Sequence, residues 1–207
     1  MVRFIPFGYD CSPASALRAL DLRDVALPFD WVESRIEGIE ECLREDFKKF
    51  HQTLFYNRTN TRMVDEYLFQ FPHDYPFNTS TENFEKTLIS DELYGERKND
   101  SIIDNWKDYH DKVLEKYNRR IERFRNITRD SEPIIVLCRY GMIEKVYKLQ
   151  ELFSELYNNN NVYFINSHPD SFETDKILCI CTEKNGNWND SEIWKQGIEH
   201  MKQKYEL

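Results

Sequence analysis

The sequence lacks a long apolar run and an excess of positive charge. No stretch of its 207 residues approaches the roughly 18 consecutive apolar residues of a transmembrane helix. Its first residues contain neither a long apolar segment nor a small-residue cleavage site. The formal net charge is -9, with 28 Lys+Arg against 37 Asp+Glu, which opposes a general attraction to nucleic acid or to an anionic membrane. We therefore expect a cytoplasmic protein without a membrane span and without a nucleic-acid partner.

Disulfide frameworks, phosphate-binding glycine loops and metal-binding patterns are also missing. The five cysteines are odd in number and fit no framework, so we expect free thiols in a reducing compartment. The sequence contains no P-loop, no Gly-x-Gly-x-x-Gly and no Asp-x-Asp motif. Cys179 and Cys181 have no histidine or cysteine at ligand spacing nearby. We predict no structural metal and no cofactor.

Strands alternate with helices at both ends of the chain. A short apolar run ends at Gly8, and a loop and then a helix with Ser12 as its predicted cap follow directly. The last third repeats strand and helix patterns over residues 134–138, 142–157, 161–165, 177–181 and 191–204. This alternation favours a mostly parallel sheet covered on both faces, and therefore a single Rossmann-like α/β domain over residues 1–207.

The middle third, about residues 33–130, interrupts this alternation and is predicted to be a helical and loop insertion. Apolar residues recur at helical spacing over 33–50 and again over 102–127, which predicts two amphipathic helices. Residues 51–100 are polar and aromatic, and we expect mostly loop and short helix there.

Ligands of α/β sheets bind at the carboxyl ends of the strands, and residues 8–12 occupy such a position. Cys11 directly precedes a helix, whose free N–H groups and dipole can stabilise a thiolate nucleophile. The same turn, with Gly8, Tyr9, Asp10 and Ser12, could equally bind a phosphate or a carboxylate. A tight structural turn with a half-buried thiol is the third interpretation.

Two segments supply candidate bases. Asp30 lies between two large aromatic residues, where partial desolvation would suit general-base chemistry, although it could instead cap a helix or pair with an arginine. His73 and Asp74 lie between two prolines, which restrict the loop and would hold the histidine in one orientation. Most lone histidines have no catalytic role, but the rigid flanks of His73 favour a functional role for it.

Arginines are concentrated on one predicted helix. Four fall within residues 119–125 of a chain that is acidic overall. Arg120 flanks the apolar stripe of the helix, and Arg123 lies between the stripe and the opposite face. Arg139 directly follows an apolar strand, where the sheet would present it to a ligand. Guanidinium groups match phosphate and carboxylate geometry, so these arginines predict a small anionic ligand. A solvated basic face and a salt bridge at the sheet rim are the structural alternatives.

The order of these motifs resembles that of a known family. The segments FGYDCSPASALR (7–18), PFDW (28–31), FPHDY (71–75) and YNRRIERF (117–124) are similar to a family of unknown function labelled "putative papain-like cysteine peptidase", found in large DNA viruses and bacteria. The resemblance implies that Cys11 is a nucleophile and His73 its base, and a location in the host-cell cytoplasm if the protein is viral. Some members look to be joined to, or encoded beside, sugar transferases, which implies work on glycans.

Three functional hypotheses follow. The first is a metal-independent glycosyltransferase-like enzyme. The turn over residues 8–12 would hold a nucleotide-sugar donor together with Arg120, Arg123 and Arg139, and Asp30 or His73 would deprotonate a glycan acceptor. The second is a cysteine hydrolase with a Cys11–His73 dyad oriented by Asp74 or Asp30. The third is a non-catalytic module that binds an anionic ligand. A parallel, adjacent arrangement of the strands that end at Gly8 and Arg139 would exclude the antiparallel barrel of papain.

Overall fold

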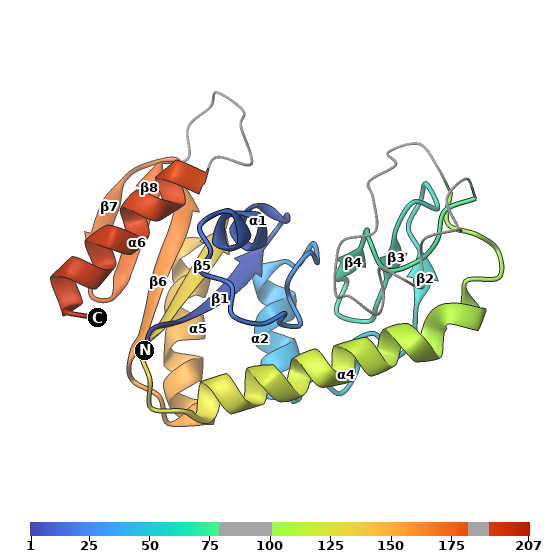
Figure 1. Cartoon of the computed structure of the whole chain (residues 1–207), viewed down its shortest axis with the longest axis horizontal. Coiled ribbons are helices and arrows are strands. Elements are labelled where there is room, and N and C mark those ends of the chain that lie inside the picture. Colours follow the sequence, from blue (N-terminus) through green and yellow to red (C-terminus); the bar gives the residue numbers. More distant parts are fainter. Residues whose placement is uncertain (79–100, 182–190) are drawn as a thin grey trace.

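The computed structural model describes residues 1–78, 101–181 and 191–207. Its main element is a sheet with the strand order β1-β5-β6-β8-β7 (Figure 1). Its members are β1 (Arg3–Gly8), β5 (Ile134–Arg139), β6 (Val162–His168), β8 (Ile177–Cys181) and β7 (Phe172–Thr174). The first four are parallel and β7 runs antiparallel to β8. The predicted Rossmann-like α/β fold with a mostly parallel sheet is therefore confirmed.

Helices cover both faces of this sheet (Figure 1). One face carries α1 (Ser12–Ala19) and α6 (Ser191–Tyr205), and the other carries α2 (Ile36–Arg44), α4 (Lys107–Arg129) and α5 (Ile143–Tyr157). Successive side chains of a strand point to opposite faces. Accordingly, Ile134, Val136 and Cys138 of β5 join the core shared with α2, α4 and α5, whereas Ile135 and Leu137 join the core shared with α1 and α6. This double burial explains the continuous apolar run in the sequence.

The edge position of β1 explains how this strand accommodates Pro6. A proline has no N–H to donate to a β-ladder, so within sheets it is confined to edges, strand starts and bulges. β1 lies at the end of the strand order and pairs with β5, in a register that places Gly8 opposite Arg139. The turn after β1 and the end of β5 therefore lie at the same edge of the sheet.

The helices α2 and α4 both lie within the predicted insertion at residues 33–130. α2 ends earlier than the helix expected over 33–50, because Asp46 and Phe47 have φ values of 49° and 64°, outside the helical region. α4 begins later than expected, and Ile102 instead forms a β-bridge with Phe77.

The region expected to be loop and short helix differs from that expectation. Antiparallel strands β2 (Phe55–Tyr56), β3 (Met63–Val64) and β4 (Gln70–Phe71) form a second, small sheet. Strands of this length are too short for an alternation of apolar and polar residues to reveal them. The rest of the region, residues 79–100, lies outside the described residues. Figure 1 shows α4 extending from this small sheet toward the parallel sheet.

Candidate active site

The carboxyl ends of β1 and β5 form a topological switch point. The two strands are parallel neighbours. The chain leaves β1 for α1 on one face of the sheet, and it leaves β5 for α5 on the other. Helices that diverge in this way leave a crevice outside the strand ends, which is where open α/β sheets bind ligands. The arrangement also distinguishes this architecture from the antiparallel barrel of papain.

Gly8 allows β1 and β5 to approach each other closely at this point. Its φ is +140°, and a Cβ there would lie 2.5 Å from the Cβ of Arg139, a distance that real Cβ atoms do not show. Ser34, which is fully buried, fixes the Gly8 carbonyl by donating from its N–H at 2.8 Å and from its hydroxyl at 3.1 Å. The turn that carries Cys11 therefore starts from a fixed point.

Cys11 is the N-cap residue of α1, with φ -78° and ψ 0°. The helix begins at Ser12, so the cap lies one residue earlier than the sequence suggested. Asp10 Oδ1 accepts the Ser12 N–H at 2.9 Å, and the Ser12 hydroxyl accepts from Trp194 Nε1 of α6 at 3.2 Å. The half-buried thiol of Cys11 is therefore held at the start of a helix that is anchored to α6.

His73 reaches Cys11 from a part of the chain that is distant in sequence. Its Nε2 lies 3.8 Å from Cys11 Sγ, across a separation of 62 residues. His73 is 8 % exposed and lies in a buried loop between β4 and the β-bridge of Phe77 with Ile102. The distance is within hydrogen-bonding reach of a sulfur, as expected for a nucleophile and its base without substrate. The pair that the resemblance implies is thus present as a geometric contact.

Asp74, next to His73, is held by α4. Its Oδ1 accepts from Lys116 Nζ in a buried ion pair, and its Oδ2 accepts from the Tyr117 hydroxyl at 2.7 Å. Burial alone would raise the pKa of Asp74, but the Lys116 ammonium and further positive charge lower it to about 2. Asp74 is therefore an ionised carboxylate that is hydrogen-bonded to two residues of α4.

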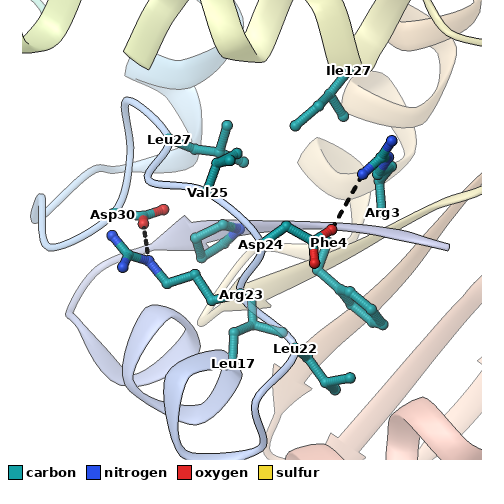
Figure 2. A pocket seen from close by; sticks show the side chains of 11 residues that line it. Arg3, Phe4, Leu17, Leu22, Arg23, Asp24, Val25, Leu27, Asp30 and Ile127 are labelled. Carbon is teal, nitrogen blue, oxygen red and sulfur yellow. Dashed lines mark hydrogen bonds and ion pairs between the residues drawn. The ribbon is translucent and has the colours of Figure 1, made fainter. Parts of the chain in front are cut away.

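Asp30 is enclosed beside Arg23. It is 1 % exposed and accepts from Arg23 Nε at 2.6 Å (Figure 2). The adjoining cavity has a volume of about 10 Å³, which is room for about one water molecule. Burial raises the pKa of Asp30, and the charges of Arg23 and Arg120 only partly offset this effect. The structure therefore gives Asp30 an arginine partner, as one of the sequence alternatives anticipated.

The three candidate arginines lie in different surroundings. Arg139 is the one that reaches the Cys11 turn, where its Nε donates to Asp10 Oδ2 at 3.1 Å and its Nη2 to the Tyr140 hydroxyl at 3.1 Å. Arg120 is buried, 5.5 Å from the centroid of the Tyr117 ring, and its charge counters the burial of both Asp30 and Asp74. Arg123 donates to the Ala26 carbonyl at 3.3 Å. Among the described residues, the contacts of these three arginines lie in three different places.

Lys116 and Ser34 are site residues that the sequence reasoning missed. Lys116 is 6 % exposed and lies three residues after the buried Val113, on the apolar face of α4. A lysine on the apolar face of a helix is a signal for a buried acidic partner, because an unpaired buried charge is costly. Ser34 offers no such signal, since only the fold brings it to Gly8.

Within the described residues, no group of three or more His, Cys, Asp and Glu side chains could hold a metal ion. In the same part of the chain, no helix has both the length and the apolar composition needed to cross a membrane.

Comparison with known proteins identifies the family. A search of curated proteins and a search of solved structures each found no match. A family model described as "Putative papain-like cysteine peptidase" matches residues 2–168, which include β1, the Cys11 turn, the His73 loop and α4. The chain therefore belongs to the family described as "Putative papain-like cysteine peptidase".

Proposed function

We propose that this protein is a cysteine hydrolase that cleaves an amide bond, or a related acyl bond, with Cys11 as nucleophile and His73 as general base. The observation that carries the proposal is the 3.8 Å contact between Cys11 Sγ and His73 Nε2. The family description favours the same chemistry. Placement at the N-terminus of α1 adds support, because a helix N-terminus and a neighbouring imidazolium both stabilise a thiolate.

The proposed reaction has two halves. The Cys11 thiol transfers its proton to His73, and the thiolate attacks the substrate carbonyl carbon to form a tetrahedral adduct. This adduct collapses to a thioester as the C–N bond breaks, and His73 gives its proton to the leaving amine. His73 then takes a proton from water, which attacks the thioester, releases the carboxylic acid and regenerates the Cys11 thiol.

The rim around Cys11 offers a surface for a substrate. Tyr9, Tyr140 and Met142 follow the ends of β1 and β5 and are 56 %, 53 % and 54 % exposed. Tyr140 has a φ of 53°, a costly conformation for a bulky residue, and its N–H donates to Ser167 Oγ at 2.9 Å. Exposed aromatic side chains held by a constrained backbone are typical of binding surfaces, and we propose that the acyl part of the substrate lies across them.

The glycosyltransferase hypothesis receives less support. It requires arginines that converge on a diphosphate. Arg120 is instead buried near Asp30 and Asp74, and Arg123 donates to a backbone carbonyl. Arg139 contacts the Cys11 turn, but it is already paired there with Asp10. We therefore place the cysteine hydrolase ahead of the transferase and of the anion-binding module.

The rate of alkylation as a function of pH tests this proposal. Cys181, also half-buried, serves as the internal control. An ordinary thiol has a pKa near 8.5, so its alkylation by iodoacetamide slows about tenfold for each pH unit below that value. We expect Cys11 to react at least about tenfold faster than Cys181 at pH 6, and His73→Ala to remove this advantage. Parallel rates for the two cysteines from pH 6 to pH 9 would contradict the proposal.

A further inference from the structure

We infer that α4 orients the base of the site, with Lys116 and Tyr117 acting through Asp74 as positioning residues for His73. This inference rests on the proposed function, because it describes how the Cys11–His73 contact is maintained. Asp74 follows His73 directly in the chain, and its carboxylate binds Lys116 Nζ through one oxygen and the Tyr117 hydroxyl through the other. These partners lie 42 and 43 residues away in sequence.

The geometry makes Asp74 a fixed point for the histidine. All three side chains are nearly or fully buried, at 4 % exposure for Asp74, 6 % for Lys116 and 1 % for Tyr117. Two hydrogen bonds from rigid helical positions leave the carboxylate little freedom to rotate, and a charged partner strengthens them. On the other side of His73, the ring of Pro72 restricts the backbone. The histidine is therefore held between a proline and an anchored carboxylate.

A second anchor holds the same loop beyond Asp74. The Tyr75 hydroxyl lies 2.8 Å from His51 Nε2 and 3.0 Å from His110 Nδ1, and His110 belongs to α4. Burial lowers the pKa of His51 to about 3, so its imidazole is neutral and does not compete with Lys116 for Asp74. The loop after β4 is thus attached to α4 at two consecutive residues.

A positioning role would explain why a buried ion pair is present here, although such a pair adds little to the stability of the fold. A buried ion pair is weak support for stability, because the desolvation of two charges offsets most of their attraction. An apolar pair of similar volume would serve the core at least as well. The directional bonds to Asp74 have a use if the neighbouring imidazole must keep Nε2 toward Cys11 Sγ, where a small misplacement lowers reactivity strongly.

Alkylation of Cys11 by iodoacetamide at two pH values tests the inference. Tyr117→Phe removes the hydroxyl and keeps the ring, whereas Lys116→Met removes the charge. At pH 6, where the thiolate depends on His73, we expect both variants to alkylate about tenfold more slowly or worse. At pH 9, where an ordinary thiol is largely ionised, their rates should match the wild type. Tyr67→Phe is the control, because Tyr67 is also a buried residue and its hydroxyl donates to Glu45 in a different region.

The outcomes separate this inference from the proposed function. If Tyr117→Phe keeps the wild-type rate at pH 6 while His73→Ala loses it, the positioning role is overturned and the dyad stands. If His73→Ala itself keeps the wild-type rate, the dyad fails and the positioning role fails with it. Equal losses at pH 6 and pH 9, or an equal loss in Tyr67→Phe, would show a general disturbance of the fold and would also overturn the inference. Should Lys116→Met fail to fold, Tyr117→Phe still decides.

Discussion

At the scale of single residues, Gly8 is a position where the neighbouring strand leaves no room for a side chain. A Cβ at this point would meet both the Cβ and the backbone nitrogen of Arg139, at 2.5 and 2.7 Å, and φ is +140°. We expect Gly8→Ala to lower the free energy of unfolding by about 2 kcal/mol or more, measured by urea denaturation. Gly197→Ala is the matched control, because its Cβ would approach Ile165 Cγ2 at 3.1 Å with no positive φ. A Gly8→Ala variant as stable as Gly197→Ala would contradict the account of this turn.

Residue identity alone indicated several members of the site. Cys11 before a helix and His73 between two prolines are patterns with a physical reason, and the structure places the two side chains in contact. The role of Asp74 was only partly predictable, because its contacts lead to Lys116 and Tyr117 on a helix that the sequence does not connect to it. Distances between segments depend on how the chain folds, and a single sequence does not contain them.

At the scale of elements, one ion pair joins the β1–α1 unit to the end of β5. Asp10 binds the first N–H of α1 and the guanidinium of Arg139 at the same time. We expect Asp10→Ala to cost about 1–2 kcal/mol, since it removes a helix-terminal hydrogen bond and leaves the largely buried Arg139 without its acidic partner. A double-mutant cycle with Arg139→Met should show coupling of about 1 kcal/mol. Strictly additive effects would mean that the two elements are not joined here.

The sequence predicted the long elements better than the short ones. The apolar run of β5 and the periodicity of α4, α5 and α6 extend far enough to give a clear signal. The two-residue strands β2 to β4 and the three-residue β7 depend on pairing partners that only the folded chain brings together. The end of α2 was missed for a similar reason, because nothing in the residue types at Asp46 and Phe47 requires positive φ values.

At the scale of the whole molecule, the buried charge of Asp74 makes the free energy of unfolding depend on pH. The pKa of Asp74 is about 2 in the folded chain and near 3.9 when unfolded. Because the folded value is depressed, this contribution is fully present above the unfolded pKa and is lost as the pH falls toward 2. The stability difference between wild type and Asp74→Asn should therefore shrink by about 1 kcal/mol between pH 7 and pH 3. Urea denaturation at both pH values measures it, with the exposed Asp111→Asn on α4 as control. A constant difference would contradict an ionised Asp74.

The structure shows where part of the positive charge of the chain is used. A net charge of -9 with an arginine-rich helix predicted one small anionic ligand. In the folded chain, Arg23, Arg120 and Lys116 instead surround the buried carboxylates of Asp30 and Asp74. Much of the local positive charge therefore compensates acids buried inside the protein.

The central claim is that Cys11 forms a covalent acyl intermediate with the help of His73. The most direct measurement is mass spectrometry of the protein after brief mixing with p-nitrophenyl acetate at neutral pH, together with the release of p-nitrophenolate. The wild type should release a burst of about one equivalent and carry one acetyl group on Cys11. Cys11→Ala should show neither, and His73→Ala should acetylate much more slowly. A wild type that releases p-nitrophenolate no faster than Cys11→Ala, with no acetyl group on Cys11, would contradict the account.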